Sequence, residues 1–456
     1  MKKRMCKIMA LAMTAAMVVP MAAQTTAFAA DDKEITYWNI AVESPDKDIV
    51  TAAVDKFNKE TKSGYTVNQV AIQNDTYKEK LVIAMSSGEC PDMYSSWSGG
   101  PMYEYIDSGF AQPIDDLLDQ SDIKDKLLDA AIEQGSYNGH VYAIPYLNVS
   151  LAGIFYNKDM FKQYGLEEPK TLADLENICA TLKENGITPF ALANGSKWTG
   201  SMYFMSLAAR YGGLEPFQNA VAGTGKFTDD CFIKAGEKIQ EWVKNGYFPD
   251  GVNSLSEDDG QAKQLLYQET AGMMLGGSFY TGAFQTDSEE FYQKKIGWFP
   301  IPAIDDSDAD PTIQIGTVGD QFISFNCEGD KLAAAFECAA DHLSDEVEDM
   351  IYSTGKIAPV KDAGDHISDP VVKEIFDAAQ EASSIQLWYD QYLPTSVATA
   401  HLDGLQEVFG LTKTPQEAQE EMQTAMDEYL STKSDSGAAD DTAEEATDDA
   451  AADDAE

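Results

Sequence analysis

The chain has 456 residues and carries 77 acidic against 32 basic side chains, for a formal charge of −45, and 44% of its residues are hydrophobic. With roughly 100–200 residues per domain, this length suits two or three domains, and the hydrophobic fraction is typical of a globular chain. Nucleic acids and anionic lipids are bound by clustered basic side chains. The composition argues against both, so we expect no nucleic-acid partner.

The charge is unevenly distributed along the chain. Residues 1–29 carry +4, residues 434–456 carry −10, and −39 remains on residues 30–433. Only Ala, Asp, Glu, Ser, Thr and Gly follow Ser434, and such a composition has too few apolar side chains to form a core. We therefore expect residues 432–456 to be a disordered acidic tail on a folded acidic body.

The first 29 residues have the pattern of a secretory signal peptide. Basic residues precede an apolar run over residues 8–23, and Ala27-Phe28-Ala29 follows as a small-residue cleavage site. Pro20 interrupts the run and leaves it short of the ~20 apolar residues that a membrane span requires. We expect a signal peptide over residues 1–29 and a secreted, extracellular protein associated with the cell surface, or a periplasmic one if the host has an outer membrane.

Strand-like and helix-like segments alternate from residue 35 onward. Residues 35–40 and 93–97 read as strands and residues 65–72 as extended, whereas apolar residues recur at helical spacing over 50–57 and 77–85. Strands that alternate with helices of this length predict right-handed βαβ units and a mainly parallel sheet.

The same alternation restarts after residue 150. Residues 151–156 read as a strand, Asn157 is placed to cap the next helix, and Thr171 with Asp174 forms a capping-box pattern. Later segments are a helix over 229–244, strands over 272–275 and 321–325, a helix over 330–343 and a last helix ending near Tyr429. The pattern predicts an α/β chain with two lobes, each a mainly parallel sheet flanked by helices.

Motifs for metal binding and catalysis are missing from the sequence. The four histidines are far apart and show no ligand spacing, and no nucleophile-elbow, zinc-protease or phosphate-loop motif occurs. Five cysteines would remain after signal removal, an odd number that does not suit a disulfide framework. We expect no cofactor, no metal and no catalytic residue.

Several sequence blocks together resemble a known family. The blocks are residues 77–93, 105–117, 138–145, 155–171, 246–251, 271–277 and 299–302. In their order and spacing they are similar to extracellular solute-binding protein family 1, the maltose-binding-protein-like sugar-binding component of ABC importers. The similarity covers nearly all of residues 34–431.

The resemblance implies a two-lobed periplasmic-binding-protein-like fold with a three-segment hinge. The lobes would comprise residues 30–146 plus 302–352 and residues 147–301 plus 353–431. The three crossings would lie near Tyr146–Asn148, Pro300–Pro302 and Ser353–Ile357, where Gly, Pro and small polar residues can absorb backbone rotation.

The implied function is capture of a carbohydrate, expected to be an oligosaccharide, in the cleft between the lobes. Hinge closure would trap the sugar, and a monomeric binding protein would deliver it to the permease subunits of an ABC transporter. Two alternatives remain open. One is an exported carbohydrate-active enzyme with two catalytic carboxylates, and the other is a sugar-sensing partner of a membrane receptor kinase.

Candidate ligand-binding residues follow from the chemistry of sugars. Hydroxyl groups need hydrogen-bond partners, and the C–H faces of sugar rings pack on aromatic rings, so carboxylates and amides beside aromatic side chains are sought at the lobe edges. The candidates are Glu43, Trp97, Tyr146, Asn148, Trp198, Phe279, Tyr280, Asp320, Trp388 and Asp390. Core packing is the alternative for each aromatic ring, and solvent exposure is the alternative for each acid. Many relatives carry Trp at the position of Phe279. Ring stacking at this position, and the identity of the ligand, are therefore less readily inferred from those relatives.

Overall fold

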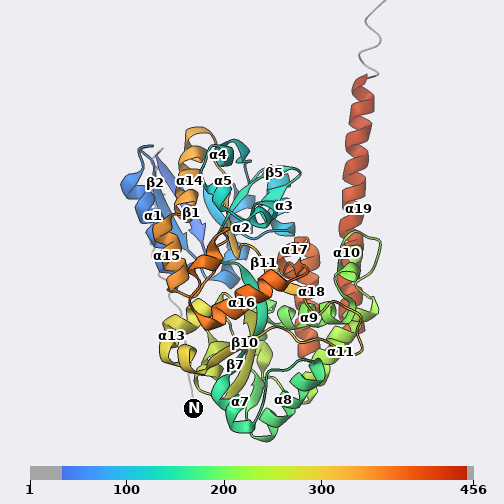
Figure 1. The fold of residues 1–456 in the computed structure, drawn as a ribbon. Helices are drawn as coiled ribbons and strands as arrows, with labels where there is room; N and C mark the ends of the chain where they lie inside the picture. The colour runs from blue at the N-terminus through green and yellow to red at the C-terminus, as the bar shows by residue number, and fades with distance from the viewer. Residues whose placement is uncertain (1–32, 449–456) are drawn as a thin grey trace, which may run out of the picture.

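The chain folds into two α/β lobes in a computed structural model that describes residues 33–448 (Figure 1). The predicted signal peptide, residues 1–29, lies outside the described residues, as do residues 449–456. Within the described part, no helix combines the length and apolar character needed to cross a membrane.

The N-terminal lobe is built on a five-stranded sheet in the order β2-β1-β3-β12-β6. Its strands are β1 (Glu34–Asn39), β2 (Thr66–Ala71), β3 (Met93–Ser96), β6 (Ala143–Tyr146) and β12 (Gln321–Phe325). β1 runs parallel to β2 and β3, whereas β12 runs antiparallel to β3 and β6. β12 comes from far along the chain and fills the place between β3 and β6.

Helices cover this sheet as the apolar periodicity predicts. They are α1 (Asp46–Glu60), α2 (Asn74–Ser87), α3 (Gly100–Asp107), α4 (Asp115–Asp119), α5 (Ile123–Lys126), α6 (Asp129–Gln134), α14 (Gly329–Asp341) and α15 (Asp345–Ser353), with a small hairpin of β4 (Ser136–Tyr137) and β5 (His140–Val141). α1 buries Val50, Val54 and Phe57 on one face and packs against α14 and α15. α2 ends at Gly88, whose φ of 75° favours glycine.

The C-terminal lobe has a sheet in the order β13-β11-β7-β9-β8, with β10 also paired to β7. Its strands are β7 (Ser150–Asn157), β8 (Thr188–Phe190), β9 (Ala271–Gly277), β10 (Ile296–Phe299), β11 (Gln314–Thr317) and β13 (Ile385–Gln386). β7 runs antiparallel to β9, β10 and β11. β8 runs parallel to β9 and β13 runs parallel to β11, so five of these six strands share one direction and β7 runs against them. The sheet is therefore mainly parallel as predicted, and the reversed direction of β7 is the feature that the sequence did not indicate. Alternating strands and helices constrain consecutive strands, whereas the neighbours of β7 are distant in sequence.

Helices surround this second sheet, and their predicted caps form. They are α7 (Lys158–Tyr164), α8 (Leu172–Glu184), α9 (Trp198–Gly212), α10 (Glu215–Val221), α11 (Asp230–Lys244), α12 (Gln261–Tyr267), α13 (Tyr280–Lys295), α16 (Pro370–Glu381), α17 (Tyr389–Tyr392) and α18 (Thr395–Phe409), with short 3₁₀ turns η1 (Asn194–Ser196), η2 (Val252–Ser254) and η3 (Ala363–His366). Asn157 Oδ1 accepts from the backbone N–H groups of Asp159 and Met160, and Thr171 with Asp174 forms the predicted capping box.

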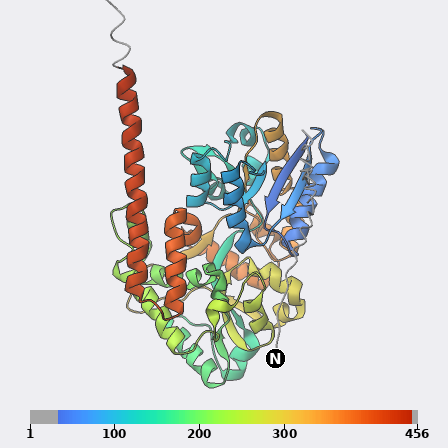
Figure 2. The same ribbon diagram turned by 180° about the vertical axis from the view of Figure 1, so that it is seen from behind.

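The last helix, α19 (Pro415–Asp448), packs beside α18 and α11 and then extends away from both lobes (Figures 1 and 2). Its helical backbone continues to Asp448, whereas the composition predicts a disordered tail over 432–456. Ala and Glu have high helix propensity, and adding residues to a helix that already exists costs less than nucleating a new one.

The crossings between the lobes differ in part from those predicted. The first lies at residues 147–149, between the end of β6 and the start of β7. The second lies at Val318–Asp320 and not at Pro300–Pro302, because β11 pairs with β7 and Ala303 bridges Thr171 within the C-terminal lobe. Residues 302–317 thus belong to the C-terminal lobe. A proline-flanked turn in the sequence does not reveal that the chain returns to the same sheet.

The third crossing begins near Ile357, within the predicted segment. The chain then stays with the N-terminal lobe, since the Pro359 carbonyl accepts from the Leu128 N–H at 3.0 Å and the Lys361 N–H donates to the Lys126 carbonyl at 3.0 Å. The chain joins the C-terminal lobe only from α16 onward, and α16 packs on β10. The predicted lobe boundary at residue 353 is therefore several residues too early.

Asn148 joins all three crossings. Its carbonyl accepts from the Asp320 N–H at 2.7 Å, and its side-chain Oδ1 accepts from the Ile357 N–H at 2.8 Å. The neighbouring Val149 N–H donates to the Ile357 carbonyl at 2.6 Å. Asn148 is only 1% exposed, so these backbone groups have no access to bulk water as an alternative partner.

Replacing Asn148 by Ala is expected to lower the free energy of unfolding by about 1–3 kcal/mol, because the buried Ile357 N–H loses its acceptor. Urea unfolding of the two proteins measures the difference. Asn185→Ala is the matched control, because Asn185 is exposed and its side chain bonds only to the Thr181 carbonyl of its own helix. Equal losses in the two variants would contradict a special role for Asn148.

Candidate ligand-binding cleft

A cleft of about 260 Å³ lies at the junction of the two lobes and is lined by residues from both. Eight of the ten residues singled out in the sequence line it: Glu43, Trp97, Trp198, Phe279, Tyr280, Asp320, Trp388 and Asp390. They come from loops and element ends that are up to about 350 residues apart in sequence. The fold thus gathers the aromatic and acidic side chains at one place.

The other two candidates lie in the hinge and do not line the cleft. Tyr146 is 1% exposed, and its hydroxyl donates to Gln321 Oε1 at 2.8 Å and lies 2.8 Å from Ser95 Oγ. The side-chain oxygen of Asn148 already accepts a hydrogen bond from the Ile357 N–H of the hinge. Both are polar residues at a lobe crossing, where buried hydrogen-bonding groups need partners whether or not a ligand is bound.

Aromatic rings form walls on both lobes. Trp97, which follows β3, has the edge of Tyr77 at a centroid distance of 5.9 Å and Lys78 Nζ 4.7 Å above its ring. On the C-terminal lobe, the rings of Trp198 and Phe279 are 6.0 Å apart. The cleft therefore has aromatic surface on opposite sides, as a sugar ring with two C–H faces requires.

Two glycines allow the C-terminal wall to form. A Cβ on Gly276 would lie 2.3 Å from the ring of Tyr280, and a Cβ on Gly277 would lie 2.3 Å from the ring of Phe279. Any other residue at these positions of β9 would push the rings away from the strand. Trp388 also lines the cleft but is only 2% exposed, so most of its ring packs in the core of the C-terminal lobe.

The cleft also contains polar residues that the sequence did not single out: Asp46, Gln73, Asn74, Lys78, Glu257, Asp258, Lys263, Gln321 and Gln391. Lys78 lies inside the family-like block over residues 77–93, and this position could have identified it as a candidate. Glu257 and Asp258 belong to the run Ser256-Glu257-Asp258-Asp259, which in sequence has the pattern of a solvated acidic loop.

Glu257 is the most unusual acid of the cleft. It is 9% exposed, and burial raises its pKa to about 8, an effect that the Tyr280 hydroxyl and Lys263 partly oppose and Asp75 reinforces. Its Oε2 is buried without a hydrogen-bond partner among the described residues. A buried polar atom at a cleft wall is suited to a ligand hydroxyl, which would satisfy it.

A second perturbed acid lies at the hinge. Burial raises the pKa of Asp320 to about 7, while Lys356 lowers it and Asp46 raises it. Lys356 is itself buried and forms an ion pair with Asp46. Two carboxyl groups that line the cleft, those of Asp46 and Asp320, thus lie near one ammonium group, Lys356, which does not line it.

The two lobes contact each other across the cleft mouth through the first turn of α2. Asp75 Oδ2 accepts from Ser196 Oγ at 2.6 Å, and Asp75 Oδ1 accepts from Trp198 Nε1 at 3.2 Å. The Asp75 N–H donates to Asp258 Oδ2 at 3.2 Å. One turn later, Lys78 Nζ pairs with Asp390 Oδ2 at 3.1 Å. These contacts hold the lobes in a closed arrangement.

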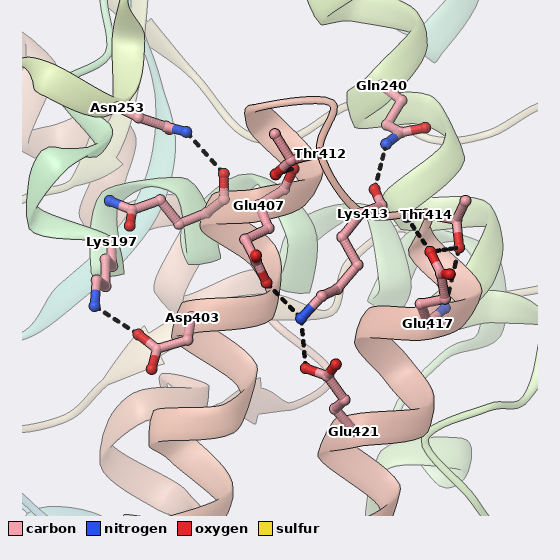
Figure 3. A network of polar contacts seen from close by, with 11 residues as sticks. Lys197, Gln240, Asn253, Asp403, Glu407, Thr412, Lys413, Thr414, Glu417 and Glu421 are labelled. Atoms are coloured by element: carbon pink, nitrogen blue, oxygen red, sulfur yellow. Dashed lines mark hydrogen bonds and ion pairs between the residues drawn. The ribbon is translucent and has the colours of Figure 1, made fainter.

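The loop that presents Trp198 is fixed from behind by α18 (Figure 3). Lys197 Nζ pairs with Asp403 Oδ1 at 2.5 Å. Gln406 Nε2 donates to the Asn194 carbonyl of the same loop at 3.0 Å. Trp198 is therefore held in place by contacts on the far side of the loop as well as by its own bond to Asp75.

No three His, Cys, Asp or Glu side chains gather as a metal site would require in the part of the chain that the structure describes. The five cysteines described there are unpaired, and four of them are buried.

Replacing Glu257 by Gln is expected to change how stability depends on pH. With a folded pKa of about 8, Glu257 keeps its proton in a pH range where the unfolded chain has released it. This group therefore lowers the free energy of unfolding as pH rises from about 4.5 to about 8, by at most about 1.4 kcal/mol per pH unit. Urea unfolding between pH 5 and 8.5 should show that the Gln variant lacks this loss.

The control for this measurement is Glu346→Gln, because Glu346 is exposed on α15 and lies outside the cleft. It should retain the dependence on pH seen in the unmodified chain. If the Glu257→Gln variant showed the same dependence of unfolding free energy on pH, that dependence would have to be assigned to another titrating group.

Comparison with known proteins agrees with this geometry. A family model described as bacterial extracellular solute-binding protein matches residues 41–340. An uncharacterized ABC transporter extracellular-binding protein of Pyrococcus horikoshii is 31% identical over 229 residues, 50% of each chain. The multiple sugar-binding protein of Streptococcus mutans is 30% identical over 183 residues, 40% of this chain and 38% of that protein. The chain spans about half the length, or less, of these two curated relatives.

Solved structures share the fold over most of the chain. One, from work on xylan utilization by the thermophilic bacterium Caldanaerobius polysaccharolyticus, has a TM-score of 0.78 and 30% identity, and covers 86% of this chain and 99% of that one. A chitin oligosaccharide binding protein has a TM-score of 0.80 and 22% identity, over 87% of this chain and 98% of that one. The two-lobed, periplasmic-binding-protein-like fold is thereby confirmed, and the chain belongs to the bacterial extracellular solute-binding protein family.

Proposed function

We propose that this protein captures a carbohydrate, specifically an oligosaccharide, in the cleft between its lobes and delivers it to the permease subunits of an ABC importer. The observation that carries the proposal is the composition of the cleft, where aromatic rings on both lobes stand beside carboxylate and amide groups. The names of similar proteins support it, since they include a multiple sugar-binding protein and an alpha-glucosides-binding periplasmic protein.

Binding follows from closure of the lobes on the sugar. The C–H faces of sugar rings pack on Trp97 and Trp198, and hydroxyl groups bond to side chains such as Glu257. A ligand that touches both lobes binds the closed state more tightly than the open one, so it shifts the population toward closure. The contacts of Asp75 and Lys78 across the mouth exist only when the lobes meet, and they add to the stability of the closed state.

The proposal predicts that residues 30–456 bind one or more of a set of oligosaccharides and release them unchanged. The test is a thermal-shift screen with cellotriose, maltotriose, xylotriose and chitotriose, followed by calorimetry of those that raise the unfolding temperature. Chromatography of the recovered sugar then separates binding from catalysis, and hydrolysis of the bound sugar would favour an exported enzyme instead.

Trp198→Ala serves as the site control for this screen and should weaken binding at least about tenfold, or about 1.4 kcal/mol. Tyr164→Ala, a partly exposed ring on α7 outside the cleft, should leave the affinity unchanged. An absence of binding by every sugar would overturn the proposal.

The contacts across the mouth predict a second, kinetic effect. Asp75→Ala removes the acceptor that Ser196 and Trp198 share, so the closed state loses stability and the sugar should dissociate several-fold faster. The association rate should change little, because changes in contacts within a bound state act mainly on dissociation. Stopped-flow tryptophan fluorescence measures both rates.

Asp55→Ala is the control for the kinetic measurement, because Asp55 is exposed on α1 away from the cleft. An unchanged dissociation rate in the Asp75 variant would show that the mouth contacts do not stabilise the bound state.

A further inference from the structure

We infer that the cleft accepts uncharged sugars and rejects glycans that carry carboxylate, sulfate or phosphate groups. The inference rests on the proposed function and adds the charge class of the ligand to it. Three features of the described residues carry it: the excess of acids around the cleft, the pairing of its lysines, and the use of the arginine elsewhere.

Carboxylates reach the cleft from both lobes and from the hinge. They are Glu43, Asp46, Asp258, Asp320 and Asp390, and they lie beside Glu257, which is mostly protonated near neutral pH. Two of the helices that begin at the cleft already have an acid at their first turn, since Asp46 lies in α1 and Asp258 accepts the Asp75 N–H of α2. The positive end of a helix dipole is a common site for an anionic ligand, and at these two helices a protein carboxylate takes that place.

The ammonium groups that line the cleft in the described structure are both paired with protein carboxylates. Lys78 Nζ is 3.1 Å from Asp390 Oδ2 and also lies above the Trp97 ring. Lys263 Nζ is 2.9 Å from Asp287 Oδ2. An anionic sugar would have to displace one of these carboxylates, and the displaced carboxylate would then repel it.

Arginine is the residue best suited to bind a carboxylate or phosphate, because it can donate two parallel hydrogen bonds. No arginine lines the cleft among the described residues. The sequence contains only Arg4 and Arg210. Arg210 is 3% exposed, its Nε and Nη2 donate to the Ile301 carbonyl at 3.1 and 3.0 Å, and its Nη1 donates to the Ile313 carbonyl at 2.7 Å. Arg210 thus ties together the segment between β10 and β11 and does not line the cleft.

The test compares sugars that differ only in charge. Cellotriose and maltotriose are measured by calorimetry beside the trisaccharides obtained by oxidising their primary hydroxyl groups to carboxylates. At 20 mM salt we expect at least one neutral trisaccharide to bind and every carboxylated one to bind at least a hundredfold more weakly. Methyl esterification of the carboxylates should restore part of the affinity.

Salt and variants separate charge from shape. Repulsion between charges is screened by salt, so the difference between a neutral sugar and its oxidised form should shrink in 500 mM salt, whereas a steric effect would not. Glu43→Gln combined with Asp258→Asn should reduce the difference about tenfold, and Glu346→Gln should leave it unchanged.

The outcomes are distinguishable. A carboxylated trisaccharide that binds as tightly as its neutral counterpart, or a difference that is insensitive to both salt and the double variant, would overturn the inference and leave the proposed function standing. If no sugar of either class bound, the proposed function and this inference would both fail.

Discussion

The hydrogen bonds around Asn148 are the constraint on which the cleft depends. One buried residue serves the backbone of all three crossing segments, through its own carbonyl to Asp320 and through its side chain to Ile357. Its neighbours Leu147 and Val149 are buried in the apolar cluster that continues from one lobe to the other. The crossings therefore form one layer, and this layer sets where the two walls of the cleft meet.

The two walls of the cleft are formed in different ways on the two lobes. On the N-terminal lobe, loops after β1 and β3 carry Glu43 and Trp97 from the sheet edge to the cleft. On the C-terminal lobe, the glycines at the end of β9 let Phe279 and Tyr280 lie close to the strand. The first turn of α2 then joins the two walls, which makes the same helix part of the binding surface and part of the closure.

The sequence was sufficient for the parts of the fold that depend on local spacing. Helical periodicity, the Asn157 cap and the Thr171 capping box were all predictable, and so were eight of the residues that line the cleft, because lobe edges follow from family-like blocks. Strand direction around β7 was not, because it depends on pairing between distant segments. Glu257 was missed for a related reason. Only the folded chain places Tyr280 against an acidic run that would otherwise be solvated.

Burial allows acidic side chains to supply the hydrogen-bond donors that a sugar needs. A sugar presents oxygen atoms that need donors as well as hydroxyl groups that need acceptors, yet this chain is rich in acids and poor in bases. Burial raises the pKa of Glu257 to about 8, so near neutral pH this side chain is mostly protonated and offers a donor beside an acceptor. Gln321 contributes in the same way, because its Oε1 is taken by the Tyr146 hydroxyl, which leaves its amide N–H groups to donate. Glu257 and Gln321 are buried by the C-terminal lobe and the hinge, and they supply the cleft with uncharged hydrogen-bond donors. The cleft therefore does not need additional cations, which would attract an anionic ligand.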